Sequence, residues 1–203
     1  MILYANGDSH TAPSWSYIGI VGEKLGLDVV NQAQYGSSNA SIIRRTREYI
    51  KENKPDFIII GWSTWEREEW NYQGEYFDVN SSGHNTLPLE LQDRYKHWII
   101  EQTPDLVWDK SVCIHEEIFK LHQDLNYLNI KHLFFNCMYK FFNISDFKMW
   151  NNSYIGPYDN DSSYYYWLTL QGIVPDEWYH FKEDGHTKWS NKLINYIKEN
   201  KLL

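Results

Sequence analysis

Residues 2–10, ILYANGDSH, carry a short apolar run directly into a glycine, an acid, a serine and a histidine. An apolar run such as Ile2–Ala5 that ends in an Asn-Gly pair is typical of a buried strand followed by a tight turn. A serine at such a turn can cap a helix, cradle a phosphate group or act as a nucleophile. Which of these roles Ser9 takes depends on what the rest of the chain brings to it.

Two more short apolar segments follow, at 27–30 and 57–60, and the segments between them have helical spacing. The run at 57–60, FIII, is apolar throughout, as expected for a strand that is buried on both faces. Alternation of such strands with helices predicts an α/β fold, a three-layer α/β/α sandwich with a mostly parallel, flavodoxin-like sheet. Later in the chain we expect helices at 87–100, at 111–128 and from Thr187 onward, and a strand at 130–136.

The chain has 203 residues, 42% of them hydrophobic, which is enough to bury a full core. Neither an internal repeat nor a linker divides it, so residues 1–203 are expected to form a single domain. Two aromatic stretches, at about 62–86 and 143–175, lack a clear period and are expected to be loop insertions. The three tryptophans of the first stretch argue against disorder there.

The net charge is −8, which disfavours nonspecific binding to nucleic acid. Arg44-Arg45 and Arg47 form a local basic run, which falls in a predicted helix and is expected to be its solvated face. The absence of an apolar run of 18 residues argues against a membrane span, and the first residues do not resemble a signal peptide. We therefore expect a protein that is cytoplasmic as synthesised, with Cys113 and Cys137 reduced.

Polar residues follow three of the predicted strands. Gly7–His10 follows the first strand, Tyr35–Asn39 comes after the second, and Gly61–Thr64 follows the third. Each segment combines a glycine, which allows close backbone approach, with small polar side chains. Ligands of open parallel sheets bind beyond the carboxyl ends of the strands, so we expect these segments to meet at one site.

A serine nucleophile needs a base to take its proton and a further group to orient that base. The segment 176–186, DEWYHFKEDGH, supplies two histidines, His180 and His186, each preceded by acids. The residue types alone leave both histidines as candidates.

With these residues the sequence resembles the SGNH, or GDSL, family of hydrolases, in patches from end to end. Gly7-Asp8-Ser9 matches the family's first block, and Asn31 with Gly36 matches the second. Gly61–Thr64 stands where the third block normally reads Gly-x-Asn-Asp, so the asparagine of that block is missing. The set GDSHT, GSSN and GWSTWERE is most similar to a divergent branch found among bacteriophage proteins.

The resemblance implies that Ser9 is the nucleophile and His180 the general base. The family's last block is Asp-x-x-His, and a Gly-His pair follows its histidine by six residues. Here His180 stands at the histidine of the block, and Gly185-His186 stands at the pair. Glu177 replaces the usual aspartate and Asp176 adjoins it, so either carboxylate is a candidate to orient the imidazole. The alternative is that residues 184–186, Asp-Gly-His, supply the acid and the base in place of the residues around His180.

The resemblance also implies an oxyanion hole that includes the backbone N–H groups of Ser9 and Gly36. Loss of one oxyanion donor typically costs about 3 to 4 kcal/mol of transition-state stabilisation. The candidates to replace the missing asparagine are Asn39, Ser63, Thr64 and Arg67. The mechanism that the family implies requires no metal and no organic cofactor.

Aromatic residues make up 17% of the chain and gather in the two expected insertions, where they could stack on sugar rings. The expected substrate contacts are His10, Trp62, Trp65 and Arg67. The predicted function is a serine esterase that hydrolyses an acyl ester, above all O-acetyl groups on a carbohydrate. The remaining histidines have no metal-ligand spacing and are expected at the surface or capped: His84, His97, His115, His122 and His132.

Two other functions stay open. The missing asparagine of the third block is compatible with an SGNH-fold carbohydrate-binding protein that has lost catalysis. Exposed aromatic residues are also compatible with a structural protein of a virion, or with a homo-oligomer.

Overall fold

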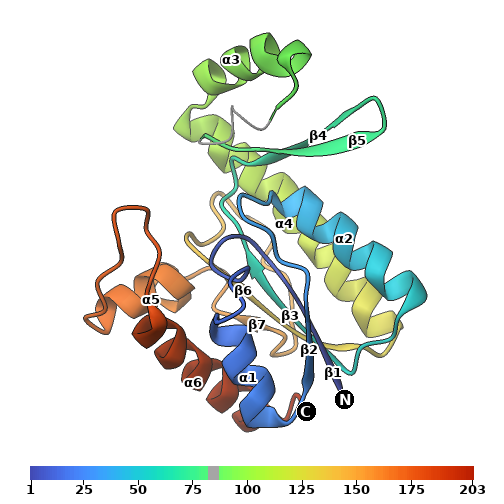
Figure 1. The fold of residues 1–203 in the computed structure, drawn as a ribbon, viewed down its shortest axis with the longest axis vertical. Helices are drawn as coiled ribbons and strands as arrows, with labels where there is room; N and C mark the ends of the chain where they lie inside the picture. Colours follow the sequence, from blue (N-terminus) through green and yellow to red (C-terminus); the bar gives the residue numbers. More distant parts are fainter. Residues whose placement is uncertain (82–86) are drawn as a thin grey trace.

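The computed structural model of the protein describes residues 1–81 and 87–203. Within these residues, five strands form the main sheet in the order β2-β1-β3-β6-β7, and every neighbouring pair is parallel (Figure 1). The strands are β1 (Ile2–Asn6), β2 (Asp28–Asn31), β3 (Phe57–Trp62), β6 (Lys131–Asn136) and β7 (Tyr154–Ile155).

Both faces of this sheet are buried, because successive side chains of a strand point to opposite faces. Leu3 and Phe57 pack into one hydrophobic cluster, whereas Tyr4 and Ile58 pack into another. The continuous apolar runs of β1 and β3 therefore fill two cores at once.

Helices cover each face. On one side α1 (Tyr17–Leu25), α5 (Tyr164–Leu170) and α6 (Glu183–Glu199) contribute to the first cluster, and on the other α2 (Asn39–Glu52) and α4 (Pro104–Tyr127) contribute to the second (Figure 1). The expected three-layer α/β/α sandwich with a mostly parallel sheet is confirmed.

Local capping sets the ends of these helices. The Ser38 hydroxyl accepts a hydrogen bond from the backbone N–H of Ser41 and begins α2, and Gly26, at φ 66°, ends α1. The helix expected at 111–128 begins earlier, at Pro104, where proline fits the first helical position and Thr103 supplies the cap.

The stretch at 62–86 is only partly a loop, which corrects the expected insertion. Residues Glu68–Tyr72 (β4) and Glu75–Val79 (β5) form an antiparallel hairpin, closed by Gln73 and Gly74 at φ 53° and 88°. Two positive φ values at a two-residue turn are typical of a type I′ hairpin. The last part of the predicted insertion, 82–86, lies outside the described residues, as does His84.

The hairpin has a small core of its own. Trp70 and Val79 pack with Leu91 and Trp98, which come from η2 (Leu89–Leu91) and α3 (Gln92–Glu101). In Figure 1 the hairpin and α3 lie at one end of the molecule, beyond α2 and α4. This third cluster is separate from the two clusters that flank the sheet.

The stretch at 143–175 is also more regular than expected. It contains β7, the short η3 (Asn160–Ser162) and α5, whose first turn is capped by the hydroxyl of Ser163. These elements are two, three and seven residues long, too short for a hydrophobic period to emerge from the sequence.

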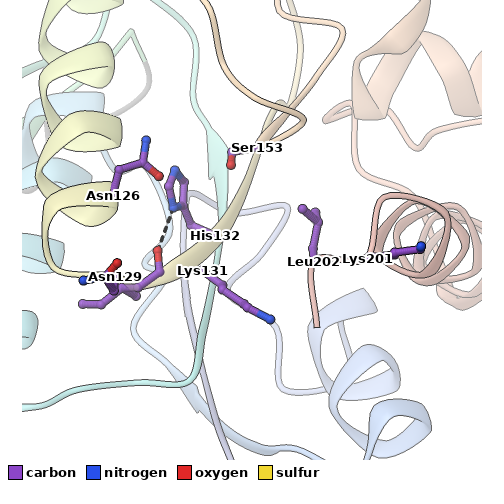
Figure 2. A pocket seen from close by; sticks show the side chains of 8 residues that line it. Asn126, Asn129, Lys131, His132, Ser153, Lys201 and Leu202 are labelled. Carbon is purple, nitrogen blue, oxygen red and sulfur yellow. Dashed lines mark hydrogen bonds between the residues drawn. The ribbon is translucent and has the colours of Figure 1, made fainter.

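Histidines 115, 122 and 132 are buried with their ring nitrogens hydrogen-bonded, so of the two expected places, at the surface or capped, the second applies. His132 Nδ1 donates to the Ile130 carbonyl at 3.0 Å, and His132 Nε2 faces His122 Nδ1 at 2.8 Å. His132 lines a cavity of about 340 Å³ at the amino end of β6 (Figure 2). Burial is the main reason that the pKa of His132 is lowered, to about 4.

The longest of these helices, α4, has 24 residues and carries charged side chains along its length. None of the described helices combines the length and apolar character needed to cross a membrane.

The buried His132 should make the fold sensitive to acid. An unfolded chain binds a proton there below about pH 6.5, whereas the folded chain does not until about pH 4, so acidification across this window favours unfolding. We expect a loss of about 1.4 kcal/mol of unfolding free energy per pH unit from this residue.

The measurement is urea unfolding of the wild type, His132→Gln and the control His97→Gln, which changes an exposed residue of α3, between pH 7 and 4. His132→Gln should have a shallower acid slope than the other two. Equal slopes for all three proteins would contradict the prediction.

Candidate active site

Four loops meet at the carboxyl ends of the strands. They are the turn after β1, the segment 34–38 after β2, the segment 63–67 after β3, and the long loop between α5 and α6 (Figure 1). Hydrogen bonds and ion pairs join each of them to another, as described below. The sequence therefore brings together the segments that were expected to converge.

The turn after β1 depends on Gly7. A Cβ atom at this position would lie 2.4 Å from Thr11 Oγ1 and 2.9 Å from the Gly61 carbonyl oxygen, so only glycine lets the ends of β1 and β3 approach. The Asp8 carbonyl then accepts hydrogen bonds from the N–H groups of Thr11 and Ala12. Ser9 lies half-buried within this turn.

Ser9 contacts one of the two candidate bases. The Nε2 atom of His180 lies 2.8 Å from Ser9 Oγ, which is hydrogen-bond distance. A serine hydroxyl donating to a neutral imidazole is the pair that nucleophilic catalysis requires.

Asp176 is the carboxylate nearest to His180. Its Oδ1 accepts hydrogen bonds from the backbone N–H groups of Trp178 and His180, both at 2.9 Å, and lies 3.9 Å from His180 Nδ1. The hydrogen bond from the His180 N–H is the main cause that lowers the pKa of Asp176. Glu177 is exposed and makes no hydrogen bond or ion pair within residues 1–81 and 87–203.

His186, the alternative base, lies elsewhere. It is buried in the first turns of α6, where its Nδ1 accepts a hydrogen bond from the backbone N–H of Tyr17 at 3.2 Å. That bond ties the start of α6 to the start of α1. The structure thus gives His186 a packing environment and places His180 beside Ser9.

His10 is a buried neighbour of this pair. Its ring lies 5.0 Å from the ring of His180 and 5.2 Å from that of Tyr164, and it is 5% exposed. Burial is the main cause that lowers the pKa of His10, to about 4, so the ring is neutral at pH 7. The ring packs against His180 and Tyr164, so its expected contact with substrate stays a prediction.

Asp8 and Arg67 form a buried ion pair next to Ser9. Asp8 is fully buried, and its Oδ2 lies 3.5 Å from Arg67 Nη1. Burial favours a higher pKa for Asp8, but His10, Arg67 and the hydrogen bond from the His10 N–H outweigh it and hold the pKa below its ordinary value. Arg67 Nη1 also donates to the Ser37 carbonyl at 3.3 Å.

Asn39, an expected oxyanion donor, has its amide fully occupied. Its Nδ2 donates to the carbonyl oxygens of Ser63 and Thr64, at 3.1 and 3.2 Å, and its Oδ1 accepts from the Ser63 N–H at 2.8 Å. This corrects the expectation: Asn39 positions the loop after β3. The Ser63 side chain is buried, and its hydroxyl lies beside the Asp8 carboxyl.

Trp62 and Trp65, expected to contact substrate, are core residues. Trp62 is fully buried at the end of β3, with its ring 5.2 Å from that of Phe134. Trp65 is 3% exposed, stacks on Phe141 and donates from Nε1 to the Lys140 carbonyl. Both rings are buried in the second hydrophobic cluster, so the structure gives neither an exposed face, and their expected contacts with substrate stay predictions.

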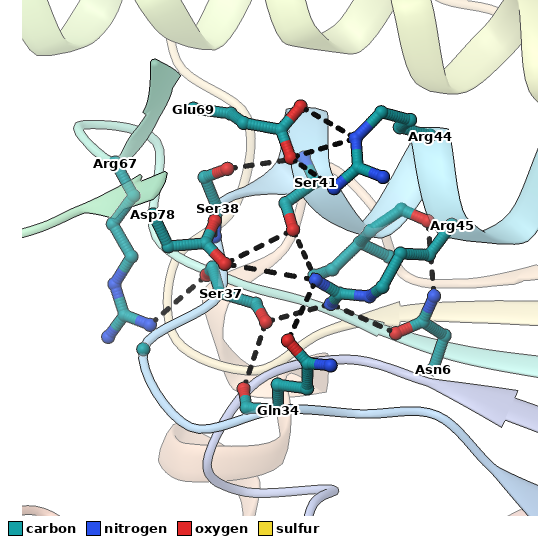
Figure 3. Close-up of polar contacts among 12 residues, drawn as sticks. Asn6, Gln34, Ser37, Ser38, Ser41, Arg44, Arg45, Arg67, Glu69 and Asp78 are labelled. Carbon is teal, nitrogen blue, oxygen red and sulfur yellow. Dashed lines mark hydrogen bonds and ion pairs between the residues drawn. The ribbon is translucent and has the colours of Figure 1, made fainter. Parts of the chain in front are cut away.

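The segment 34–38 is held by Arg45, a residue whose role the sequence did not reveal (Figure 3). Arg45 Nη2 donates to Ser37 Oγ at 2.8 Å and to Asn6 Oδ1 at 3.4 Å, and Nη1 donates to Gln34 Oε1 at 3.3 Å. Only 11% of the Arg45 side chain is exposed, so it does not belong to a solvated helix face. Arg44 and Arg47 are more exposed and pair with acids.

Asp78 of β5 completes this network (Figure 3). Its Oδ1 accepts a hydrogen bond from the Ser38 N–H at 2.7 Å, and its Oδ2 accepts one from Ser41 Oγ at 3.1 Å. Asp78 also lies 3.8 Å from Arg45. The hairpin therefore fixes the segment that includes Gly36, whose φ of 77° favours glycine.

Exposed aromatic residues flank His180, at positions that the sequence did not single out. Trp178 is 69% exposed and Tyr179 is 60% exposed. Tyr179 has a φ of 65°, a conformation that is costly for a bulky residue and is held here by the turn that Asp176 closes. Its ring lies 6.0 Å from that of Tyr165.

Comparisons with known proteins complete the description of the site. No protein-family model and no curated protein sequence matches the chain. Solved structures do match it. TesA is 13% identical over 100% of each chain, with a TM-score of 0.53.

Two further structures have informative descriptions. A catalytic mutant of Axe2, an acetylxylan esterase from Geobacillus stearothermophilus, is 14% identical over 96% of this chain and 93% of its own, with a TM-score of 0.53. A GDSL-like lipase from Bacteroides thetaiotaomicron is 11% identical over 97% of this chain and 87% of its own, with a TM-score of 0.50. The strand order, the layers and these likenesses agree, and the chain has the fold of the SGNH, or GDSL, hydrolases.

Proposed function

We propose that this protein is a serine ester hydrolase with Ser9 as nucleophile and His180 as general base. The observation that carries the proposal is the 2.8 Å contact between Ser9 Oγ and His180 Nε2 at the carboxyl edge of a parallel sheet. Two side chains so distant in sequence meet at the place where such sheets bind ligands.

The reaction follows from this pair. His180 Nε2 takes the proton of Ser9 as Oγ attacks the ester carbonyl, and the carbonyl electrons move onto the oxygen. The backbone N–H groups of Ser9 and Gly36 donate to that oxyanion. When the intermediate collapses, His180 gives its proton to the leaving alcohol. Water, deprotonated by His180, then releases the carboxylic acid and restores Ser9.

Asp176 is the carboxylate that we assign to His180. At 3.9 Å from Nδ1 it is too far for a hydrogen bond to the ring, so it acts through its charge on the imidazolium. Its hydrogen bonds to the Trp178 and His180 N–H groups also shape the turn that presents the ring.

The proposed substrate is an acyl ester of a carbohydrate, above all an O-acetyl ester. Trp178 and Tyr179 offer aromatic faces with polar edges beside His180, and such surfaces suit sugar rings better than lipid chains. The likeness to an acetylxylan esterase supports the same class. Association with a virion and homo-oligomer formation stay predictions from sequence.

Removal of either member of the pair should abolish hydrolysis. We expect Ser9→Ala and His180→Ala each to lower kcat on p-nitrophenyl acetate by on the order of 10⁴- to 10⁶-fold. A fluorophosphonate probe should label Ser9 in the wild type, with the modified peptide located by mass spectrometry.

The matched control is His186→Ala. It leaves the Tyr17 N–H without its acceptor and should lower stability by about 1 to 3 kcal/mol, while Ser9 is still labelled. Loss of labelling in a folded His186→Ala protein, with labelling retained in His180→Ala, would reverse the assignment of the base.

Substitutions that remove only the carboxylate charge should distinguish the roles of Asp176 and Glu177. Asp176→Asn keeps an oxygen to accept the Trp178 and His180 N–H groups, so the turn survives and only the charge is lost. We expect kcat to fall about 10- to 100-fold, less than the ~10⁴-fold loss at a buried triad carboxylate, because Asp176 is 42% exposed. Glu177→Gln should change kcat less than about twofold, because Glu177 is exposed and has no partner among the residues that the structure describes. A larger effect at Glu177 than at Asp176 in steady-state kinetics would contradict the assignment.

The aromatic residues should matter more for sugars than for small esters. Trp178→Ala and Tyr179→Ala should raise KM for an acetylated xylo-oligosaccharide about tenfold, the equivalent of about 1.4 kcal/mol of ring contact. The loss on p-nitrophenyl acetate should be smaller. Tyr127→Ala, which changes an 87% exposed ring on α4, is the control and should alter neither reaction. Equal losses on both substrates would argue against a sugar subsite.

A further inference from the structure

The guanidinium of Arg67 lies between the two loops that carry the implied oxyanion donors. Its Nη1 is 3.5 Å from Asp8 Oδ2 and 3.3 Å from the Ser37 carbonyl oxygen. Asp8 directly precedes Ser9, and Ser37 directly follows Gly36. One cationic side chain therefore touches the immediate neighbours of both backbone donors.

Most of this guanidinium has no partner. Nε is buried and makes no hydrogen bond in the described part of the chain, and Nη2 donates no hydrogen bond there either. Within the same residues, three more buried polar atoms around it lack a hydrogen bond: Asp8 Oδ2, His10 Nδ1 and Ser63 Oγ. Of these atoms, Arg67 Nε is a charged N–H group, and buried N–H groups are rarely left unpaired, so its lack of a partner indicates that an acceptor belongs beside the guanidinium.

The other candidates for a third oxyanion donor are either occupied or buried beside a carboxylate, and the Thr64 hydroxyl donates to Glu66 Oε1 at 2.7 Å. Both N–H bonds of the Asn39 amide go to backbone carbonyls, and the Ser63 N–H goes to Asn39 Oδ1. The Ser63 hydroxyl is 2% exposed and lies beside the Asp8 carboxyl. Arg67, with 19% of its side chain exposed, is charged, has free donors and is partly open to solvent.

We propose that Arg67 supplies the oxyanion donor that the family's third block normally provides through asparagine. This inference rests on the proposed ester hydrolysis. As Ser9 Oγ bonds to the carbonyl carbon, an electron pair moves onto the carbonyl oxygen. An N–H group of the guanidinium donates a hydrogen bond to the oxyanion that forms. On collapse that pair re-forms the carbonyl, and Arg67 gives up no proton. Asp8 and the Ser37 carbonyl hold the guanidinium in place before substrate arrives.

A purely structural role has different consequences. If Arg67 only neutralises Asp8, then removing both charges together should restore an active site. If Arg67 donates to the oxyanion, removing both charges should not restore it. The double substitution Asp8→Asn/Arg67→Gln separates these cases, and it avoids leaving Asp8 buried without its cation.

The first experiment measures kcat and KM on p-nitrophenyl acetate, with melting temperatures to verify folding. Arg67→Gln and Asp8→Asn/Arg67→Gln should both lose about 10²- to 10³-fold in kcat, with a much smaller change in KM. Arg67→Ala should regain part of its lost kcat when guanidinium chloride is added at concentrations below those that unfold it. The control Arg47→Ala, which breaks an exposed pair with Asp124 between α2 and α4, should keep wild-type kcat without any response to guanidinium. Wild-type kcat in the folded double variant would overturn the inference.

A second readout needs no turnover. Phenylboronic acid forms a tetrahedral anionic adduct on an activated serine, and its affinity should fall at least tenfold in Arg67→Gln, as for loss of one charged hydrogen bond. If the wild type hydrolyses esters but Arg67→Gln matches it in kcat and boronate affinity, only the inference about Arg67 fails. If the wild type binds boronate through Arg67 but hydrolyses no ester, only the proposed function fails. A wild type that does neither overturns both.

Discussion

The hydrogen bond between Ser9 and His180 joins side chains 171 positions apart, so it exists only while several elements hold the two ends of the chain together. β1 lies between β2 and β3, which fixes the turn that carries Ser9. α6 packs with α1 in the first hydrophobic cluster, and the bond from the Tyr17 N–H to His186 locks the starts of both helices. The loop before α6 can then present an imidazole to the serine with little freedom.

The surroundings of this pair are unusually polar for a protein interior. Burial of the Asp8 carboxylate and the Arg67 guanidinium costs several kcal/mol per ion, and their mutual attraction repays that only with good geometry and further hydrogen bonds. Here the ion pair is 3.5 Å long and several neighbouring polar atoms lack partners in the described residues. Stability alone does not explain such a cluster, which fits the proposed reaction, in which negative charge develops beside Arg67.

The sequence was sufficient for the sheet, because continuous apolar strands are visible in one dimension. The residue types alone left His180 and His186 open, and His180 was chosen only from its place in the family's last motif. The sequence was insufficient where a role depends on burial. A tryptophan such as Trp62 looks the same in a loop or at a strand end, and Asn39 can be recognised as a loop brace only when its carbonyl partners are known. The hairpin at 68–79 was hidden because its alternation is interrupted by charges such as Glu68, which pairs with Lys110 of α4. Arg45 was misassigned for the same reason: helical spacing does not show which arginine faces inward.

The separate core of the β4–β5 hairpin has a consequence for motion. Asp78 of that hairpin holds the Ser38 N–H and the Ser41 hydroxyl at the start of α2, next to the segment that contains Gly36. A small cluster built from one hairpin and one short helix can open locally at lower free energy than the cores on either side of the main sheet. The segment with Gly36 would then lose its brace whenever the hairpin opens, without global unfolding. Amide hydrogen exchange at Ser38 is therefore expected to follow the hairpin, so the site would have the local stability of the hairpin cluster, the smallest of the three that the described residues form.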